Sequence, residues 1–196
     1  TETAYREVKK LAPAHSLLIT GNRRVSLRHY HAFETGSPIA TQAEPVFLEV
    51  YRAVWQQAVA RRVPSAGNIG CENSGGLDSG SITSEVARQL GPEIDRLHGM
   101  GFSYEPLEPE YIKATVDQWG IKNSLMYSGD TTMDAERIQQ RVMQVNGAPQ
   151  EHANGYSHFP FYEYCQSKGI HHLLSGFGGD EAVTYPGGIP ARLELL

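Results

Sequence analysis

Apolar and polar residues follow two different periods along this chain, and the changes of period divide it into elements. Residues 11–20 and 23–31 alternate apolar with polar side chains on either side of Gly21-Asn22, which predicts a β-hairpin. Residues 33–43 carry glycine, serine and proline without either period and are predicted to form a linker. From residue 44 to residue 62 apolar side chains recur at helical spacing until Pro64, among them Val46, Val50, Val54 and Val59.

Beyond this first helix, short apolar runs alternate with helical periods. Strands are predicted over residues 66–73, 95–102, 124–127 and 169–175, and helices over residues 79–90, 108–120, 134–145 and 159–168. The third of these helices is predicted to be capped by Thr131, with Asp134 three residues later. Alternating strands and helices with short connections predict an α/β fold, in which a parallel sheet is covered on both faces. Ligands of such sheets bind at the carboxyl ends of the strands.

A glycine-rich turn follows the first of these strands. Residues 73–79 read Asn-Ser-Gly-Gly-Leu-Asp-Ser and lead directly into a helix. Backbone N–H groups and the positive end of a helix converge on an anion in this geometry, and glycine lets the main chain approach a ligand closely. Asp78 would repel a phosphate directly but can share a divalent cation with it. The turn therefore predicts a site for phosphates and a metal ion.

A second glycine turn ends the last strand. Residues 173–180 read Leu-Leu-Ser-Gly-Phe-Gly-Gly-Asp, and Glu181 follows. If both strands belong to one parallel sheet, both turns lie at its carboxyl edge. If Asp78 and Asp180 share a metal ion, their carboxylates must face one cleft, and we then expect the two strands to be parallel and close in the sheet.

The two motifs together resemble those of the asparagine synthetase family, which belongs to the ATP pyrophosphatase (PP-loop) superfamily. The resemblance covers residues 11 to about 188 and implies a Rossmann-like adenine nucleotide alpha hydrolase fold. It implies ATP and Mg²⁺ as cofactors, with Asp78 and Asp180 as metal ligands. The residues that it implies for nucleotide binding are Ser74, Gly75, Gly76, Leu77, Asp78, Ser79, Met100, Ser175 and Gly176.

The same resemblance divides the chain into two parts. Residues 1–43 are similar to the hairpin that ends the amidotransferase domain of these enzymes and to the linker after it, and residues 44–196 are similar to the ATP-binding domain. The catalytic N-terminal cysteine of the amidotransferase domain has no counterpart here, and the chain begins at Thr1. We expect a piece of a longer enzyme, with a glutaminase domain and a helical C-terminal part in the parent chain.

Several positions depart from the family pattern or allow two interpretations. Phe177 stands where the family carries glutamate, which puts asparagine formation in doubt and leaves the catalytic residues unassigned. Met100 lies in a segment whose backbone meets adenine in the family, but a methionine at a strand end can equally fill the core. We interpret Glu72 as a carboxylate with a local partner. His158, with His152, Asn154 and Tyr156, precedes the last helix, either as a solvated loop or as part of an acceptor pocket.

Composition and charge limit the partners, the cellular location and the metal sites that we expect for this protein. The net charge of −5 argues against nucleic acid as a partner. No apolar run reaches the length of a membrane span. Cys71 and Cys165 are expected to be buried, reduced thiols of a cytoplasmic protein, and the histidines lack the pattern of a zinc site.

The function implied is that of an ATP-dependent, amide-forming ligase. Such an enzyme adenylates a small carboxylate or a peptide, releases pyrophosphate, and passes the acyl group to ammonia or an amine with release of AMP. Alternatives are a ring-closing relative such as a β-lactam synthetase or lasso-peptide cyclase, a nucleobase-modifying enzyme of the same superfamily, and a nucleotide-binding module without catalysis. The oligomeric state does not follow from the sequence.

Overall fold

The computed structural model describes residues 3, 5–32, 44–103, 105–128, 134–149 and 158–179. A four-stranded parallel sheet, in the order β5-β4-β3-β6, lies at its centre. The strands are β3 (Ile69–Glu72), β4 (Leu97–Ser103), β5 (Asn123–Ser128) and the short β6 (Leu173–Leu174). Every neighbouring pair is parallel, which confirms the predicted sheet.

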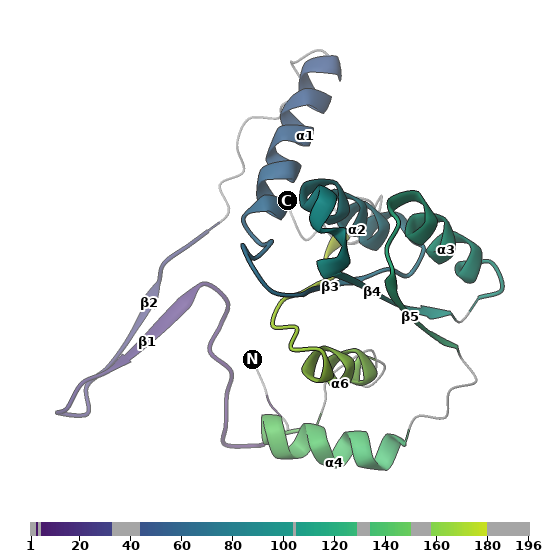
Figure 1. The fold of residues 1–196 in the computed structure, drawn as a ribbon. Helices are drawn as coiled ribbons and strands as arrows, with labels where there is room; N and C mark the ends of the chain where they lie inside the picture. The colour runs from purple at the N-terminus through teal and green to yellow at the C-terminus, as the bar shows by residue number, and fades with distance from the viewer. Residues whose placement is uncertain are drawn as a thin grey trace.

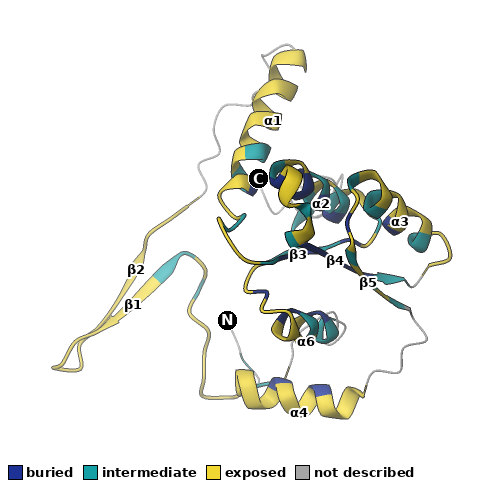
Figure 2. Ribbon diagram, in the orientation of Figure 1, coloured by how far each residue is buried: buried dark blue, intermediate teal, exposed yellow. Residues whose placement is uncertain are grey.

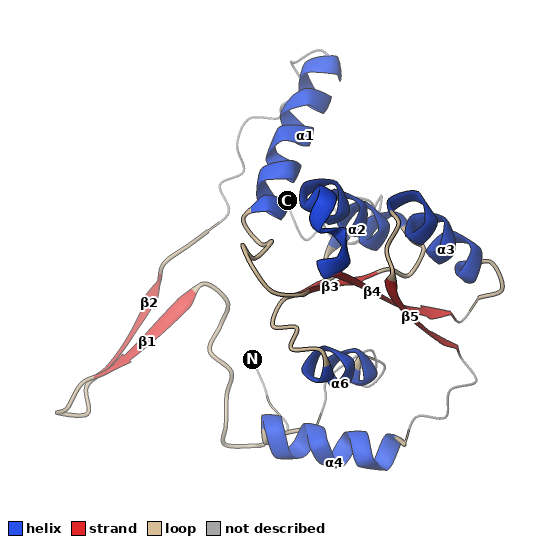
Figure 3. Cartoon of the chain, viewed as in Figure 1, coloured by secondary structure: helices blue, strands red, loops and turns tan. Residues whose placement is uncertain are grey.

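Helices cover both faces of this sheet, as Figures 1 and 3 show. On one face lie α2 (Leu77–Leu90) and α3 (Glu108–Trp119), with α1 (Glu44–Ala60) beside α2. On the other face lies α6 (Phe159–Ser167), and α4 (Ala135–Asn146) lies farther out on that side. The α/β architecture with two covered faces therefore agrees with the prediction.

Two clusters of buried apolar side chains hold these layers together (Figure 2). Between the sheet and α2, one cluster includes Ile69, Cys71, Val86 and Leu97, and it extends to Ile121 at the end of α3. Between the sheet and α6, the other consists of Met100, Phe161, Cys165 and Ile170. Alternation along each strand divides the side chains between the two faces.

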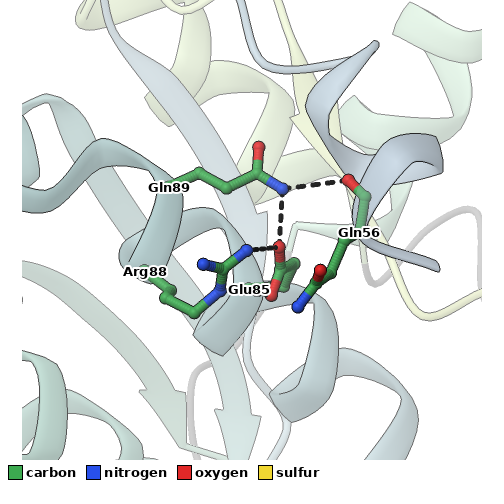
Figure 4. A network of polar contacts seen from close by, with 4 residues as sticks. All are labelled: Gln56, Glu85, Arg88 and Gln89. Carbon is green, nitrogen blue, oxygen red and sulfur yellow. Dashed lines mark hydrogen bonds and ion pairs between the residues drawn. The ribbon is translucent and has the colours of Figure 1, made fainter. Parts of the chain in front are cut away.

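A polar network joins α1 to α2 (Figure 4). The amide nitrogen of Gln89 donates to the backbone carbonyl of Gln56, at 3.0 Å, and to Oε1 of Glu85, at 2.6 Å. Arg88 donates to both carboxylate oxygens of Glu85 through Nε and Nη2. These hydrogen bonds to Arg88 hold the pKa of Glu85 below its usual range, although burial opposes the change.

The β-hairpin forms as predicted, from β1 (His15–Ile19) and β2 (Val25–His29), with His15 opposite His29. It lies apart from the parallel sheet in Figure 1. Its apolar side chains, Leu17, Leu18, Ile19, Val25 and Leu27, are all exposed. The predicted linker over residues 33–43 lies outside the described residues.

Several boundaries differ from the sequence-based prediction. Helix α2 begins at Leu77, two residues early, so Asp78 and Ser79 belong to its first turn. A 3₁₀ helix, η2 (Gly91–Arg96), takes the first two residues predicted for β4. The predicted cap Thr131 was wrong, because the N-cap of α4 is Asp134, whose Oδ1 accepts the N–H of Arg137 at 2.9 Å.

The apolar face predicted for α1 is largely uncovered among the described residues. Of its side chains, only Val59 is buried, whereas Val46, Val50 and Val54 are exposed. Both cysteines are buried and free, as predicted. Within the described parts of the chain, no helix combines the length and the apolar character needed to cross a bilayer.

Candidate functional site

The first glycine loop joins the end of β3 to the start of α2. Gly75 has a φ of +83°, in the left-handed region that favours glycine. A Cβ at this position would lie 2.8 Å from the Cβ of Tyr111 and 3.3 Å from the carbonyl oxygen of Glu108. Both the backbone conformation and the contact with α3 therefore require glycine here.

Two serine hydroxyls fix the shape of this loop. The Oγ of Ser79 accepts the N–H of Ser74 at 3.1 Å and lies 2.9 Å from the Oγ of Ser74. The N–H of Gly76, the N-cap of α2, donates to the Oγ of Ser74 at 3.4 Å. The positive end of α2 thus lies at a loop with two hydroxyl groups, an arrangement suited to an anion.

The second glycine loop lies directly against the first. β6 pairs with β3 in parallel, with Gly70 opposite Leu173 and Cys71 opposite Leu174. This pairing confirms that the strands before the two loops are close neighbours, although about a hundred residues separate them in sequence. Both loops therefore lie at the carboxyl edge of the sheet.

Contacts at two glycines show how closely the loops meet. A Cβ at Gly176 would lie 2.6 Å from the backbone nitrogen of Ser79. A Cβ at Gly179 would lie 2.8 Å from the Cβ of Asp78 and closer still to its carboxylate. Gly179 also donates its N–H to the carbonyl of Gly176 at 3.0 Å, which closes the turn. The second loop thus contacts the first turn of α2 at the acidic residue.

A third glycine lets β4 pass beneath the first loop. The backbone carbonyl of Asn73 lies so close to Gly101 that a Cβ at Gly101 would overlap it. Asn73 is itself 1% exposed, donates from Nδ2 to the carbonyl of Ile112 at 3.2 Å, and has an Oδ1 without a partner among the described residues. This hydrogen bond holds the end of β3 against α3 and so helps to position the first glycine loop.

The predicted nucleotide residues divide into two groups. The structure brings together residues 74–79 with Ser175 and Gly176, whose loops are in contact. It does not bring the side chain of Met100 there. Met100 is fully buried in the middle of β4, its Sδ 3.9 Å from the Sγ of Cys165, and its carbonyl accepts the N–H of Asn73 at 2.7 Å. The side chain fills the core, which leaves only backbone contacts for a ligand.

Glu72 has the local partner that its position suggested. Its Oε1 lies 3.2 Å from Nε2 of His158, the N-cap of α6. His158 also stacks edge-on against Phe102 and Phe161. His152, Asn154 and Tyr156, named with His158 as candidates for an acceptor pocket, lie outside the described residues.

A magnesium ion would find one carboxylate here among the described residues, that of Asp78. Asp180 and Glu181 lie outside them, so the shared cleft of the two aspartates stays a prediction. In the described part of the chain, no three His, Cys, Asp or Glu side chains gather to hold a metal ion. Mg²⁺ bound to a nucleotide takes one or two carboxylates and fills its other positions with phosphate oxygens and water. The donor set therefore fits Mg²⁺ carried by phosphates.

Sequence reasoning missed two features of this site. Gly101 lets β4 approach the backbone of Asn73, and Gly179 lets the second loop approach Asp78. In the sequence, the glycine itself is the only sign of either contact. The aromatic residues Tyr51 and Trp55 of α1 lie near the second loop, where they line one pocket with Gly176 and Phe177. Helical periodicity placed Tyr51 on an apolar face but could not show what that face adjoins.

The sequence of this chain is similar to those of known proteins. The family model described as asparagine synthase matches residues 50–195. A protein of Methanocaldococcus jannaschii assigned as glutamine-hydrolysing asparagine synthetase 2 is 27% identical over 181 residues, which are 90% of this chain and 34% of the relative. The 7-cyano-7-deazaguanine synthase of Methanothrix thermoacetophila is 24% identical over 142 residues, 65% of this chain and 63% of that protein.

Solved structures also include a protein with a similar fold. The NH3-dependent NAD synthetase of Campylobacter jejuni superposes with a TM-score of 0.42 at 12% identity, over 76% of this chain and 62% of its own. The chain thus spans about a third of the length of the first relative and just under two thirds of the second.

Proposed function

Because this chain belongs to the asparagine synthase family, we propose that it is the ATP-binding part of an enzyme of the ligase class. Its reaction is the adenylation of a carboxylate at the expense of ATP, followed by formation of an amide. The carboxylate oxygen attacks the α-phosphorus, and the bond to the pyrophosphate oxygen breaks. The nitrogen of ammonia or an amine then attacks the acyl carbon, loses a proton, and AMP departs.

The observation that carries this proposal is the contact between the two glycine loops at Asp78. Gly176 and Gly179 approach the first turn of α2 so closely that neither tolerates a Cβ without movement. A strand order that places β6 beside β3 brings both loops to the carboxyl edge, where open α/β sheets bind their ligands. Because the two loops are neighbours at this edge, both can contact one bound nucleotide.

Each part of the site has a role in this proposal. The hydroxyls of Ser74 and Ser79 and the amides of the α2 N-terminus hold the β- and γ-phosphates. Asp78 and Asp180 would hold Mg²⁺, which would neutralise charge on the phosphates. Ser175 and Gly176 lie toward the AMP portion. Donors fixed in place before the reaction stabilise charge that develops in the transition state.

The parent protein is also part of the proposal. We expect residues 1–43 to end an amidotransferase-like domain and residues 44–196 to begin the synthetase domain. A glutaminase domain would then supply ammonia, as the name of the Methanocaldococcus jannaschii relative indicates for that protein. Phe177, which cannot accept a proton, supports an acyl substrate other than aspartate.

Calorimetry with α,β-methylene-ATP and Mg²⁺ tests nucleotide binding. The analogue cannot be cleaved at the α–β bond, so the heat reports binding alone. We expect Asp78→Asn to weaken binding about tenfold or more, since a charged contact contributes about 1.5–3 kcal/mol. We expect Gly75→Val to abolish it, because the side chain would meet α3 and change the loop.

Matched controls separate these effects from general damage. Gly147→Val introduces a branched side chain at another left-handed glycine, with a φ of +67° and open space around it. Asp117→Asn removes an exposed carboxylate of α3 that pairs with Lys113. Both controls should bind like the wild type. Unchanged affinity in Asp78→Asn and Gly75→Val would place the nucleotide elsewhere.

A further inference from the structure

A pocket of about 420 Å³ lies beside the contact between the two loops. Its walls come from α1, from the first two turns of α2 and from the second glycine loop. Asp78, Gly176 and Gly179 belong both to this pocket and to the proposed nucleotide site. A molecule whose carboxylate reaches the phosphates therefore has this pocket next to it.

The pocket is lined mainly by aromatic and aliphatic side chains, namely Tyr51, Trp55, Leu77, Ile82 and Phe177. Apart from the hydroxyl of Tyr51 and the indole N–H of Trp55, the polar side chains among its described lining are those of Asp78 and Ser81. A charged group bound here would lose part of its hydration, and no cationic side chain of the described lining would compensate for that loss. An apolar group would not pay this cost of desolvation. The walls thus favour an apolar occupant.

Two of these side chains stand out by their exposure. Leu77 is 84% exposed and Phe177 is 82% exposed, although each lies at a loop of the site. Exposed apolar residues around a concave site are typical of surfaces that a ligand covers. The volume falls within the range of small-molecule sites, about 300–1,000 Å³, and accepts a group as large as a benzyl side chain.

We propose that this pocket binds the apolar side group of the carboxylate substrate, aromatic or branched aliphatic in character. This inference rests on the proposed ligase function and adds the class of its acyl substrate. The carboxylate of the substrate lies toward Asp78 and the phosphates, and its side group lies between Phe177 and the aromatic residues of α1. A negatively charged side group, such as that of aspartate, is disfavoured, because it would lie beside the Asp78 carboxylate and the apolar walls.

The two tryptophans of the chain allow a direct test. Trp55 lines this pocket and also a neighbouring one with Arg61 and Arg62, whereas Trp119 ends α3. In a Trp119→Phe variant, the fluorescence comes from Trp55 alone. The variants Phe177→Ala and Tyr51→Ala then assign the change to this pocket, because neither residue belongs to the described lining of the other one. Phenylacetate serves as the apolar probe and succinate as the polar probe, each titrated over the millimolar range with and without α,β-methylene-ATP and Mg²⁺.

We expect a saturable change of Trp55 fluorescence with phenylacetate and none with succinate. Phe177→Ala and Tyr51→Ala, each made in the Trp119→Phe background, should weaken phenylacetate binding about tenfold, since each removes an aromatic contact. The matched control Val145→Ala removes an exposed apolar side chain of α4, 65% exposed, and should change nothing.

Two results would overturn the proposal: equal responses to phenylacetate and succinate, or unchanged phenylacetate affinity in both pocket variants. The titration without nucleotide keeps this test apart from that of the proposed function. A phenylacetate response without any nucleotide binding would support the pocket and contradict the ligase. Nucleotide binding without a phenylacetate response would support the ligase function and contradict the proposed pocket.

Discussion

Replacement of Gly179 by alanine tests whether the second loop positions Asp78. The added Cβ would lie 2.8 Å from the Cβ of Asp78, and carbon atoms normally approach to about 3.5–4.0 Å. Either the carboxylate or the loop must therefore move by roughly 1 Å, and overpacking of this kind costs about 1–3 kcal/mol. If the strain falls on the ligand site, we expect the affinity for Mg²⁺ and nucleotide to decrease by about tenfold or more.

Gly147→Ala is the matched control for this substitution. Gly147, which ends α4 outside both glycine loops, has a φ of +67° and open space around it, so an added Cβ strains the backbone but contacts nothing. We expect it to lower the free energy of unfolding by about 1–2 kcal/mol and to leave nucleotide affinity within about twofold.

A double-mutant cycle with Asp78→Ala shows whether the effect passes through that carboxylate. Calorimetry with α,β-methylene-ATP and Mg²⁺ gives the binding free energy for the wild type, both single variants and the double variant. Because the two residues are in contact, we expect a coupling energy above about 1 kcal/mol. Additive effects, with a coupling below about 0.5 kcal/mol, would refute the reasoning.

Three further predictions concern buried ionisable groups. Burial, and then the charge of Lys168, lowers the pKa of His98, so its neutral form is favoured in the fold. Stability should be full above the ordinary value of 6.5 and fall as the pH drops below it, and His98→Asn should reduce this loss in chemical denaturation between about pH 7.5 and pH 5. Burial raises the pKa of the Cys71 thiol to about 12 and also raises that of Cys165, so neither should react quickly with a disulfide reagent at pH 8 until guanidinium unfolds the chain; rapid native reaction of both would contradict their burial. Glu85→Gln should cost about 1–2 kcal/mol of unfolding free energy at neutral pH. Because the pKa of Glu85 is lowered, its contribution is present above the ordinary carboxyl pKa and is lost as the pH falls through the lowered value, so the variant should match the wild type only in acid.

Much of the central sheet could be predicted from local pattern. The apolar runs before residues 73 and 175 are short and end in glycine, which strongly favours strands that end at a turn. Because parallel strands bring their carboxyl ends to one edge, the order of elements placed both loops at that edge, whereas their closeness was expected only if Asp78 and Asp180 share a metal ion. The pairing of β3 with β6 confirms both the shared edge and the closeness.

What could not be predicted depends on contacts between distant segments. Periodicity identified an apolar face on α1, but whether Val50 and Val54 are covered depends on what lies beside the helix. Met100 alternates with Gly99 and Gly101, which places it on one face of β4, yet only the position of α6 decides that it fills the core. Likewise Gly179 is needed because Asp78, a hundred residues away in sequence, lies against it.

A crystal structure with α,β-methylene-ATP and Mn²⁺ would show directly whether the two glycine loops hold a nucleotide and its metal ion. Mn²⁺ takes the same oxygen ligands as Mg²⁺ and is located by its anomalous scattering. The account predicts a single metal peak at coordination distance from the Asp78 carboxylate, with the phosphates held between residues 74–79 and residues 175–179. An ordered nucleotide bound away from these two loops, or a phosphate-bound metal remote from Asp78, would contradict it.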